Sequence, residues 1–290
     1  MTMSSSQLTE IYHGLSSADL QCLPAEAGRQ CHGKLWSNLR EVCELLNIPF
    51  AASIPDGELL FQHVHFKTGQ RIHTIGQAFD TFYVVNSGFL KTVSIDEFGN
   101  GQVLSFPMKG DLLGVDGIYT KKHSSEAVAL SDCNLILLPF KNLIALGRAH
   151  AELEQAVYCL LSRELMRKQV LLNMLGALCA EARVARFLVS LADKYAEIGY
   201  SGQRFTLRMS RQEIGSYLGL SLETVSRTLS ALNEMGLISV DQRAIRINDR
   251  EMLKALRRIP PSRSRARQVV SNKLAPGTTW SHAIANSPVN

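Results

Sequence analysis

Three polar side chains in the C-terminal part of the chain share a spacing that suits hydrogen bonding to DNA bases. Ser226 and Arg227 come three and four residues after Glu223, so a helix would place all three on one face. Arginine can donate two hydrogen bonds to O6 and N7 of guanine, glutamate can accept one from N4 of cytosine, and serine can serve either base. We therefore interpret these residues as base contacts of a DNA-binding helix.

The residues around this triplet suit the phosphate backbone. Hydroxyl, amide and guanidinium side chains near helix N-termini donate hydrogen bonds to phosphate oxygens, as do the helix amides themselves. The candidate phosphate contacts are Ser210, Arg211, Gln212, Ser221 and Thr224.

Two short helices joined by a tight turn must position these side chains. Ser210 and Glu213 form a capping box, which predicts a helix that begins at Arg211. Gly219 tolerates positive φ and ends this helix, and Ser221 can cap the next one. The predicted inward stripe of the second helix is Val225, Leu229 and Leu232. A helical hairpin in an ordinary core is the alternative, but the exposed Glu-x-x-Ser-Arg pattern after two caps favours a helix-turn-helix.

Over residues 205–240 the chain resembles the cAMP receptor protein/FNR (CRP/FNR) family of bacterial transcription regulators. Its Glu223-x-x-Ser226-Arg227 pattern is similar to the FNR branch, whereas the cAMP receptor branch has glycine at the position of Ser226. The resemblance implies a homodimer that reads a TTGAT-N4-ATCAA palindrome in double-stranded DNA. Residues 237–240 and 244–247 alternate like a hairpin and match the family's wing.

The sequence pattern in the middle of the chain is typical of an antiparallel β-structure. Between residues 54 and 138, short apolar runs alternate with turn residues. Asn86-Ser87-Gly88 and the Gly110–Gly114 segment match landmarks of the family's cyclic-nucleotide-binding-like β-roll. The predicted fold class is therefore α+β, with a β-roll, a long helix and a winged helix-turn-helix.

A long helical run over residues 153–180 is apolar on two sides and so needs two partners. One partner would be the β-roll, and the other would be the same helix of a second subunit, since a palindromic site is read by one recognition helix per subunit. The heptad set assigned to the dimer interface is Leu153, Val157, Leu160, Arg167, Leu171, Met174 and Leu178, with polar Glu164 in its middle. The alternative is a helix buried within a single chain.

The 290 residues suit two domains with tails. We expect an N-terminal extension over 1–50, a β-roll sensor domain over 51–150, a dimerisation helix over 151–180 and a DNA-binding domain over 181–259. A basic tail over 260–290, rich in Pro, Ser and Arg, is expected to be disordered.

The charge and hydropathy of the chain bear on its location and partners. The formal net charge is +5, but seven Lys and Arg and no Asp or Glu occur from Lys254 onward, so the tail carries the basic excess. No signal peptide and no uninterrupted apolar run long enough to span a membrane is visible. We expect a cytoplasmic bacterial protein without a membrane partner, and with RNA polymerase as a partner if it activates transcription.

The effector of the β-roll is the open question. In cAMP-binding relatives a glutamate and an Arg-Ser pair bind the ribose and the cyclic phosphate. Here the matching segments read Gly114-Val115-Asp116-Gly117 and Ser124-Ser125, so the arginine is missing. A phosphate would be buried without a counter-charge, which is costly, and cAMP binding is therefore disfavoured.

The FNR branch carries a [4Fe–4S] cluster, whose ligands are an N-terminal cysteine group and one central cysteine. The candidate ligands here are Cys22, Cys31, Cys43 and Cys133, but their spacing departs from the family pattern: Asn47 precedes Ile48-Pro49-Phe50 where the family has cysteine. An irregular cluster or a thiol switch is the alternative, and buried apolar cysteines are favoured.

Two other function classes are weaker. A His-x-His at His63 and His65, with His73 nearby, is reminiscent of metal-dependent cupin enzymes, but the later glutamate and histidine are missing, and we expect surface or hydrogen-bonded histidines. No nucleotide-binding, nucleophile or paired-acid motif occurs, so no enzyme is predicted. A regulator that acts only through protein contacts is disfavoured by the intact Glu223, Ser226 and Arg227.

Overall fold

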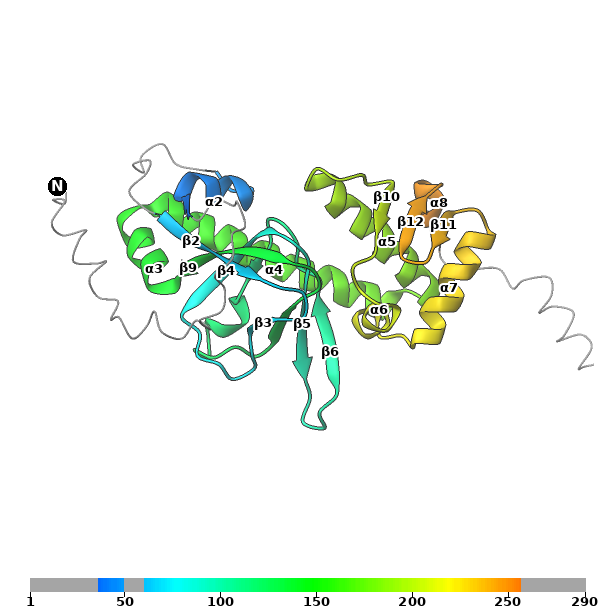
Figure 1. Cartoon of the computed structure of the whole chain (residues 1–290), viewed down its shortest axis with the longest axis horizontal. Coiled ribbons are helices and arrows are strands. Elements are labelled where there is room, and N and C mark those ends of the chain that lie inside the picture. Colours follow the sequence, from blue (N-terminus) through cyan, green and yellow to red (C-terminus); the bar gives the residue numbers. More distant parts are fainter. Residues whose placement is uncertain (1–35, 50–59, 257–290) are drawn as a thin grey trace, which may run out of the picture. The chain divides into compact units, whose positions relative to one another are not determined.

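A computed structural model describes residues 36–49 and 60–256 of the chain (Figure 1). The predictions that concern Cys22, Cys31 and the basic tail lie outside these residues. A short strand opens the described part: β1 (Trp36–Asn38) precedes helix α2 (Leu39–Leu45). Asn38 forms a capping box with Glu41, which starts the helix at Leu39.

The β-roll consists of two antiparallel sheets. One has the strand order β1-β2-β9-β4-β7 and the other β3-β8-β5-β6. The strands are β2 (Leu60–Phe66), β3 (Arg71–His73), β4 (Thr81–Ser87), β5 (Leu90–Ile95), β6 (Gly101–Ser105), β7 (Leu112–Leu113), β8 (Glu126–Ala129) and β9 (Cys133–Pro139). All their described pairings are antiparallel, as the alternation of apolar runs and turns predicts.

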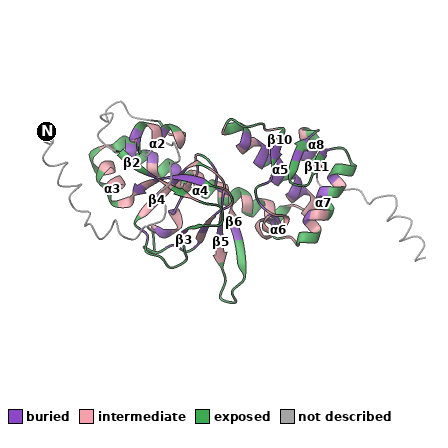
Figure 2. Ribbon diagram, in the orientation of Figure 1, coloured by how far each residue is buried: buried purple, intermediate pink, exposed green. Residues whose placement is uncertain are grey.

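Buried apolar side chains of both sheets hold the roll together. Phe82, Val84 and Ile136 lie in one cluster, and Leu90 and Leu135 in another. In Figure 2 buried residues are purple, and they occur along the strands of the roll and over much of helix α5. The sequence did not single out the helix α3 (Phe140–Ala149), which follows β9 directly.

The long helix α4 (Ala151–Ala177) packs its first half against the chain's own β-roll. Leu153 and Leu160 are buried in the cluster that contains Phe82. Arg167 donates a hydrogen bond of 2.7 Å from Nη1 to Oδ1 of the buried Asp111. These three residues were assigned to the dimer interface, and in the structure all three side chains contact the chain's own β-roll.

The opposite side of α4 presents large apolar side chains to the surface. These side chains are 60–70% exposed, and they are Tyr158, Leu165, Met166, Val170 and Leu172. The remaining predicted interface residues, Val157, Leu171, Met174 and Leu178, are half-buried. A helix apolar on two sides was therefore foreseen, and the heptad set includes three residues, Leu153, Leu160 and Arg167, that face the chain's own β-roll.

The C-terminal region is an α-helical unit with a small sheet. It contains α5 (Ala180–Glu197), α6 (Arg211–Leu218), α7 (Leu222–Glu234) and α8 (Arg250–Ala255). The strands β10 (Arg204–Thr206), β11 (Ile238–Asp241) and β12 (Ala244–Ile247) form a sheet in the order β10-β12-β11. The β11–β12 hairpin is the predicted wing, whereas β10 and α8 were not foreseen.

Candidate nucleic-acid interface

The first helix of the predicted pair starts at its capping box. Ser210 Oγ accepts a hydrogen bond from the Glu213 amide at 3.2 Å, and Glu213 Oε2 accepts one from the Ser210 amide at 2.7 Å. Two amides that lack partners within the helix are thereby satisfied. Gly219 then ends α6 with φ 64° and ψ 41°. This is the left-handed conformation that was predicted for this glycine from the sequence.

The turn between the helices is close enough to exclude a side chain at Gly215. A Cβ there would lie 2.6 Å from the carbonyl oxygen of Leu220. The nearest atoms belong to Leu220 and Ser221, in the turn itself. The Leu220 amide donates to the Gly215 carbonyl at 2.8 Å, which fixes the turn.

The second helix, α7, is capped and anchored as predicted. Ser221 is its N-cap residue, and Ser221 Oγ accepts from the Thr224 amide at 3.2 Å. Its buried side chains are Val225, Thr228, Leu229 and Leu232. Thr228 was not foreseen in this set. The burial fixes the rotation of α7 about its axis, and with it the residues that face outward.

The three candidate base contacts lie on the uncovered side of α7. Glu223 and Arg227 are exposed and Ser226 is half-buried. Arg227 Nη2 lies 3.4 Å from Thr224 Oγ1, so the guanidinium remains near the start of the helix. The Glu223 carboxyl accepts from its own amide and from Ser221, and with nearby Arg227 these contacts lower its pKa. The carboxylate is therefore ionised at neutral pH and can accept from a base amine.

The candidate phosphate contacts gather at the starts of the two helices. Arg211 and Gln212 are in the first turn of α6, and Ser221 and Thr224 are at the start of α7. The Oγ atom of Ser210 acts as the acceptor of the capping box, which leaves its hydroxyl hydrogen to donate. This arrangement combines exposed or half-buried donors with two helix N-termini, and both features favour phosphate binding.

A second feature lies in the β-roll, at the segments that the resemblance equates with a nucleotide pocket. Asp116 in the short 3₁₀ helix η1 (Val115–Gly117) accepts hydrogen bonds from Ser124 and Ser125 through Oδ2. The two amides donate at 2.9 Å each, and the Ser124 and Ser125 hydroxyls lie at 3.2 Å and 2.8 Å. Burial raises the pKa of Asp116, but the Ser125 bonds and two nearby histidines more than offset it and lower the value.

The two described candidate cluster cysteines have surroundings that suit neutral thiols. Cys43 is buried in α2, where burial and nearby Glu44 raise its pKa to about 11. Cys133 in β9 donates from Sγ toward the carbonyls of Phe89 and Ser131, at 3.4 Å and 3.0 Å, and burial raises its pKa. A cluster binds thiolates, so both thiols would have to lose their protons, and Cys133 its two carbonyl contacts, to bind one.

The histidines differ from one another. His65 is exposed, and His63 is buried with its Nε2 atom 2.9 Å from Ser37 Oγ. His73 is hydrogen-bonded as expected, with Nδ1 3.1 Å from the Ser125 carbonyl oxygen, but its Nε2 atom has no hydrogen-bond partner among the described residues. His73 is 1% exposed and stacks on His123, with ring centroids 3.8 Å apart.

Two family models match this chain, one in the helical C-terminal region and one in the β-roll. The family model described as a Crp-like helix-turn-helix domain matches residues 182–256, and the one described as a cyclic nucleotide-binding domain matches residues 63–150. No helix among the described residues is long and apolar enough to cross a membrane.

Curated relatives and a solved structure resemble most of the chain. The transcriptional regulatory protein btr of Bordetella pertussis is 38% identical over 75% of this chain and 90% of its own length. The transcriptional activator protein anr of Pseudomonas aeruginosa is 34% identical over 73% of this chain and 88% of its own length. The structure of FixK2 from Bradyrhizobium japonicum has a TM-score of 0.64 and 25% identity, covering 70% of this chain and all of that one.

Proposed function

Because this chain belongs to the CRP/FNR family of DNA-binding transcription regulators, we propose that it reads an FNR-like palindrome, TTGAT-N4-ATCAA, as a homodimer. The observation that supports this most directly is the placement of Glu223, Ser226 and Arg227 on the uncovered face of α7. In the major groove, Arg227 would donate to guanine and Glu223 would accept from cytosine. The family does not consist of enzymes, and we assign no catalytic residue.

The phosphate backbone would position this helix. Donors at the starts of α6 and α7 would bind phosphates on either side of the groove, with Arg211 supplying charge and Ser210, Gln212, Ser221 and Thr224 supplying neutral donors. Each bidentate base contact contributes roughly 1–3 kcal/mol of discrimination, whereas phosphate contacts contribute affinity that falls with salt.

The dimer would form through the exposed apolar side of α4. Tyr158, Leu165, Met166, Val170 and Leu172 recur along this side, and water is excluded from them only if a partner covers them. The same helix of a second copy is the occupant that a palindrome requires, because each subunit then presents one α7. Leu153, Leu160 and Arg167 are left out of this interface, since they are used internally.

The β-roll of this chain would not bind cAMP. The amides and hydroxyls of Ser124 and Ser125 already donate to the Asp116 carboxylate, which takes the place of an anionic ligand. A cyclic phosphate entering here would meet a like charge and no arginine, so its desolvation would be uncompensated. We assign Cys43 and Cys133 to packing within the protein core rather than to binding of an iron–sulfur cluster.

The relatives bear on the direction of regulation. The anr relative is named a transcriptional activator. If this chain also activates, RNA polymerase is its further partner, and the cytoplasm is where both DNA and polymerase would be met.

The test is a binding competition with the purified full-length chain. Fluorescence anisotropy would measure binding to a labelled duplex that carries the palindrome, against three competitors: the same site, a scrambled site, and a site with roughly 5 bp inserted between the half-sites. The insertion turns one half-site about half a helical turn away from the other. We expect the intact palindrome to compete more than 100-fold better than either altered duplex, and equal competition by all three would refute the proposal.

A further inference from the structure

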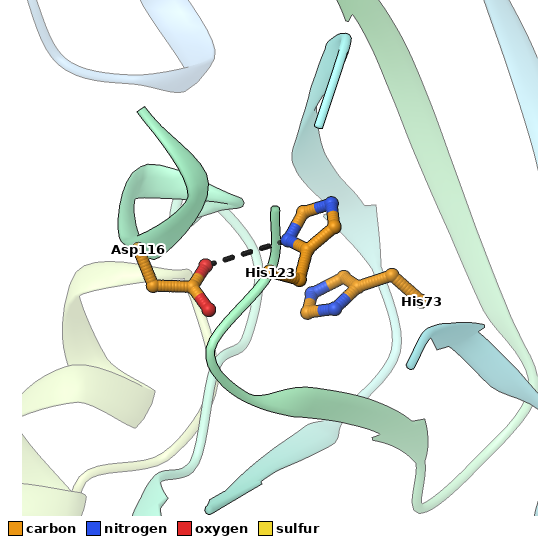
Figure 3. Close-up of side chains that lie close together, drawn as sticks. All are labelled: His73, Asp116 and His123. Carbon is orange, nitrogen blue, oxygen red and sulfur yellow. Dashed lines mark hydrogen bonds and ion pairs between the residues drawn. The ribbon is translucent and has the colours of Figure 1, made fainter. Parts of the chain in front are cut away.

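Three side chains with metal-binding atoms converge in the β-roll (Figure 3). His73 ends β3, Asp116 lies in η1, and His123 precedes β8. One ligand atom from each residue lies within 4.8 Å of those of the other two. Both histidines are buried, at 1% and 3% exposure, and Asp116 is half-buried.

The hydrogen bonds of His73 leave one of its nitrogens without a partner. Nδ1 lies 3.1 Å from the Ser125 carbonyl oxygen, and only a protonated nitrogen can donate to it. The lone pair is therefore on Nε2, which is buried and has no hydrogen-bond partner among the described residues. A buried polar atom without a partner costs about 1–3 kcal/mol, so it is uncommon unless something binds there.

Asp116 is oriented by its neighbours with one oxygen left for a ligand. Its Oδ2 atom accepts the four donors of Ser124 and Ser125, whereas Oδ1 faces His123 Nδ1 at 3.5 Å. Carboxylates and histidines that bind metals are commonly fixed in this way by hydrogen bonds from their second atoms. His73 is fixed in the same way, by the hydrogen bond that its Nδ1 atom donates to the Ser125 carbonyl oxygen.

We propose that His73, Asp116 and His123 bind one divalent transition-metal ion of the Zn²⁺ or Fe²⁺ class in the β-roll. Two imidazoles and one carboxylate are a donor set that these ions accept, with further positions open to water or another ligand. Mg²⁺ and Ca²⁺ prefer oxygen donors, so they are excluded as occupants.

Binding requires a small rearrangement of one ring. The His73 and His123 rings are stacked with 14° between their planes, and imidazole lone pairs lie in the ring plane. Nearly parallel planes do not meet at one ion. His73 is held by Ser125, so His123, whose ring packs edge-on against Phe79, is the ring that would have to turn about its Cβ–Cγ bond. Bonds of about 2.0–2.1 Å then draw the three ligand atoms together.

This site goes beyond DNA reading and joins separate parts of the roll. An ion would tie the end of β3 to η1 and to the segment that opens β8, which includes the Ser124-Ser125 donors. A ligand that binds only the folded state stabilises it, so occupancy would stiffen the region that the family uses for effectors.

The experiment measures metal binding by the full-length protein after chelator treatment. Equilibrium dialysis against Zn²⁺, against Fe²⁺ without oxygen, and against Mg²⁺ would be followed by elemental analysis. The variants are His73→Gln and His123→Gln, and the matched control is His65→Gln, which changes an exposed histidine of the same roll. Wild type and control should bind one Zn²⁺ or Fe²⁺ per chain and no Mg²⁺, and both test variants should bind at least 100-fold more weakly.

X-ray absorption of the wild-type Zn²⁺ complex provides an independent readout if a variant fails to fold. The proposal expects nitrogen and oxygen ligands only, with the scattering of two imidazoles. Sulfur ligands would assign the ion to the cysteines and overturn it. So would the absence of stoichiometric binding by wild type, or equal binding by a folded His123→Gln variant.

Discussion

Gly215 and Leu220 are in contact through their backbones, at the point where α6 passes into the turn before α7. The Leu220 amide donates to the Gly215 carbonyl at 2.8 Å, and a Cβ on residue 215 would lie 2.6 Å from the Leu220 carbonyl oxygen. That spacing is shorter than atoms tolerate, and both partners are backbone. The orientation of α7 relative to α6 therefore depends on the absence of a side chain at residue 215.

Gly215→Ala should open the turn and shift α7. We expect a destabilisation of about 1–3 kcal/mol, the usual range for overpacking, and a loss of affinity for the palindrome of more than tenfold. The control is Gly147→Ala in α3, where a Cβ would meet only ordinary contacts from 3.6 Å. Thermal unfolding and anisotropy check both effects. A Gly215→Ala variant with wild-type stability and affinity would contradict this account of the turn.

The sequence predicted this motif well because its determinants are local. A capping box joins residues three apart, and a left-handed glycine and an N-cap serine act within one turn of their own helices. Strand β10 shows the opposite case. Its three residues, Arg204–Thr206, are too few for an alternating pattern, and it exists because β12 pairs with it.

Two features of the chain that the sequence could not decide depend on contacts between distant residues. A heptad pattern shows that α4 has an apolar stripe, but not whether Leu153 and Leu160 meet the chain's own roll or a partner. The His73, Asp116 and His123 cluster comes from three segments that only the roll brings together. Asp116 and Ser124-Ser125 were noticed for what they lack as a nucleotide pocket, and their bonding to each other was not foreseeable.

Base reading and phosphate binding are separable with two arginines. Arg227→Ala should abolish the preference for the palindrome over a scrambled site, because about 1–3 kcal/mol of discrimination is lost per half-site. Arg211→Ala should weaken binding to both duplexes alike and reduce the slope of log affinity against log salt by about 1 per subunit. Anisotropy across a salt series measures both. Unchanged selectivity in Arg227→Ala would remove this residue from base reading.

The dimer interface is testable on the exposed side of α4. Val170→Glu places a charge on a side chain that is 68% exposed in one chain but would be buried between two. We expect folded monomers by light scattering and a large loss of binding to the palindrome, since burying an unpaired charge is costly. Lys168→Glu, an exposed position on the same helix, should remain dimeric. A dimeric Val170→Glu protein would place the interface elsewhere.

The cysteine assignment predicts the absence of an iron–sulfur chromophore. Cys43 is held as a buried thiol in α2, and the Cys133 thiol donates to the carbonyls of Phe89, just before β5, and Ser131, just before β9. Protein purified without oxygen should therefore lack cluster absorption in the visible range and contain no acid-labile sulfide. A stoichiometric brown chromophore that disappears in Cys133→Ala would overturn the assignment.

Asp111 gives the chain a defined dependence on acid. It is 6% exposed, and its carboxylate accepts from Arg167 at 2.7 Å, Lys194 at 3.0 Å and the Met108 amide at 3.0 Å. Burial alone would raise its pKa, but the two cations and the amide more than offset this, and the pKa in the folded state is lowered. The carboxylate therefore contributes stability above the unfolded value of about 3.9.

That contribution is lost as the pH falls from about 4 through the folded pKa of Asp111, because the folded state then has to take up the proton that the unfolded state already binds. Asp111→Asn should destabilise the protein by about 1–3 kcal/mol at pH 7, since Arg167 and Lys194 are partly exposed and regain water. The difference from wild type should shrink as the pH falls below 4. Denaturant unfolding at fixed protein concentration between pH 7 and pH 3 measures it, with Asp241→Asn on the wing as the control. If the difference in unfolding free energy between wild type and Asp111→Asn stays constant over this range, the charge of Asp111 does not stabilise the protein. The stabilisation would then come only from the hydrogen bonds and packing of the Asp111 side chain.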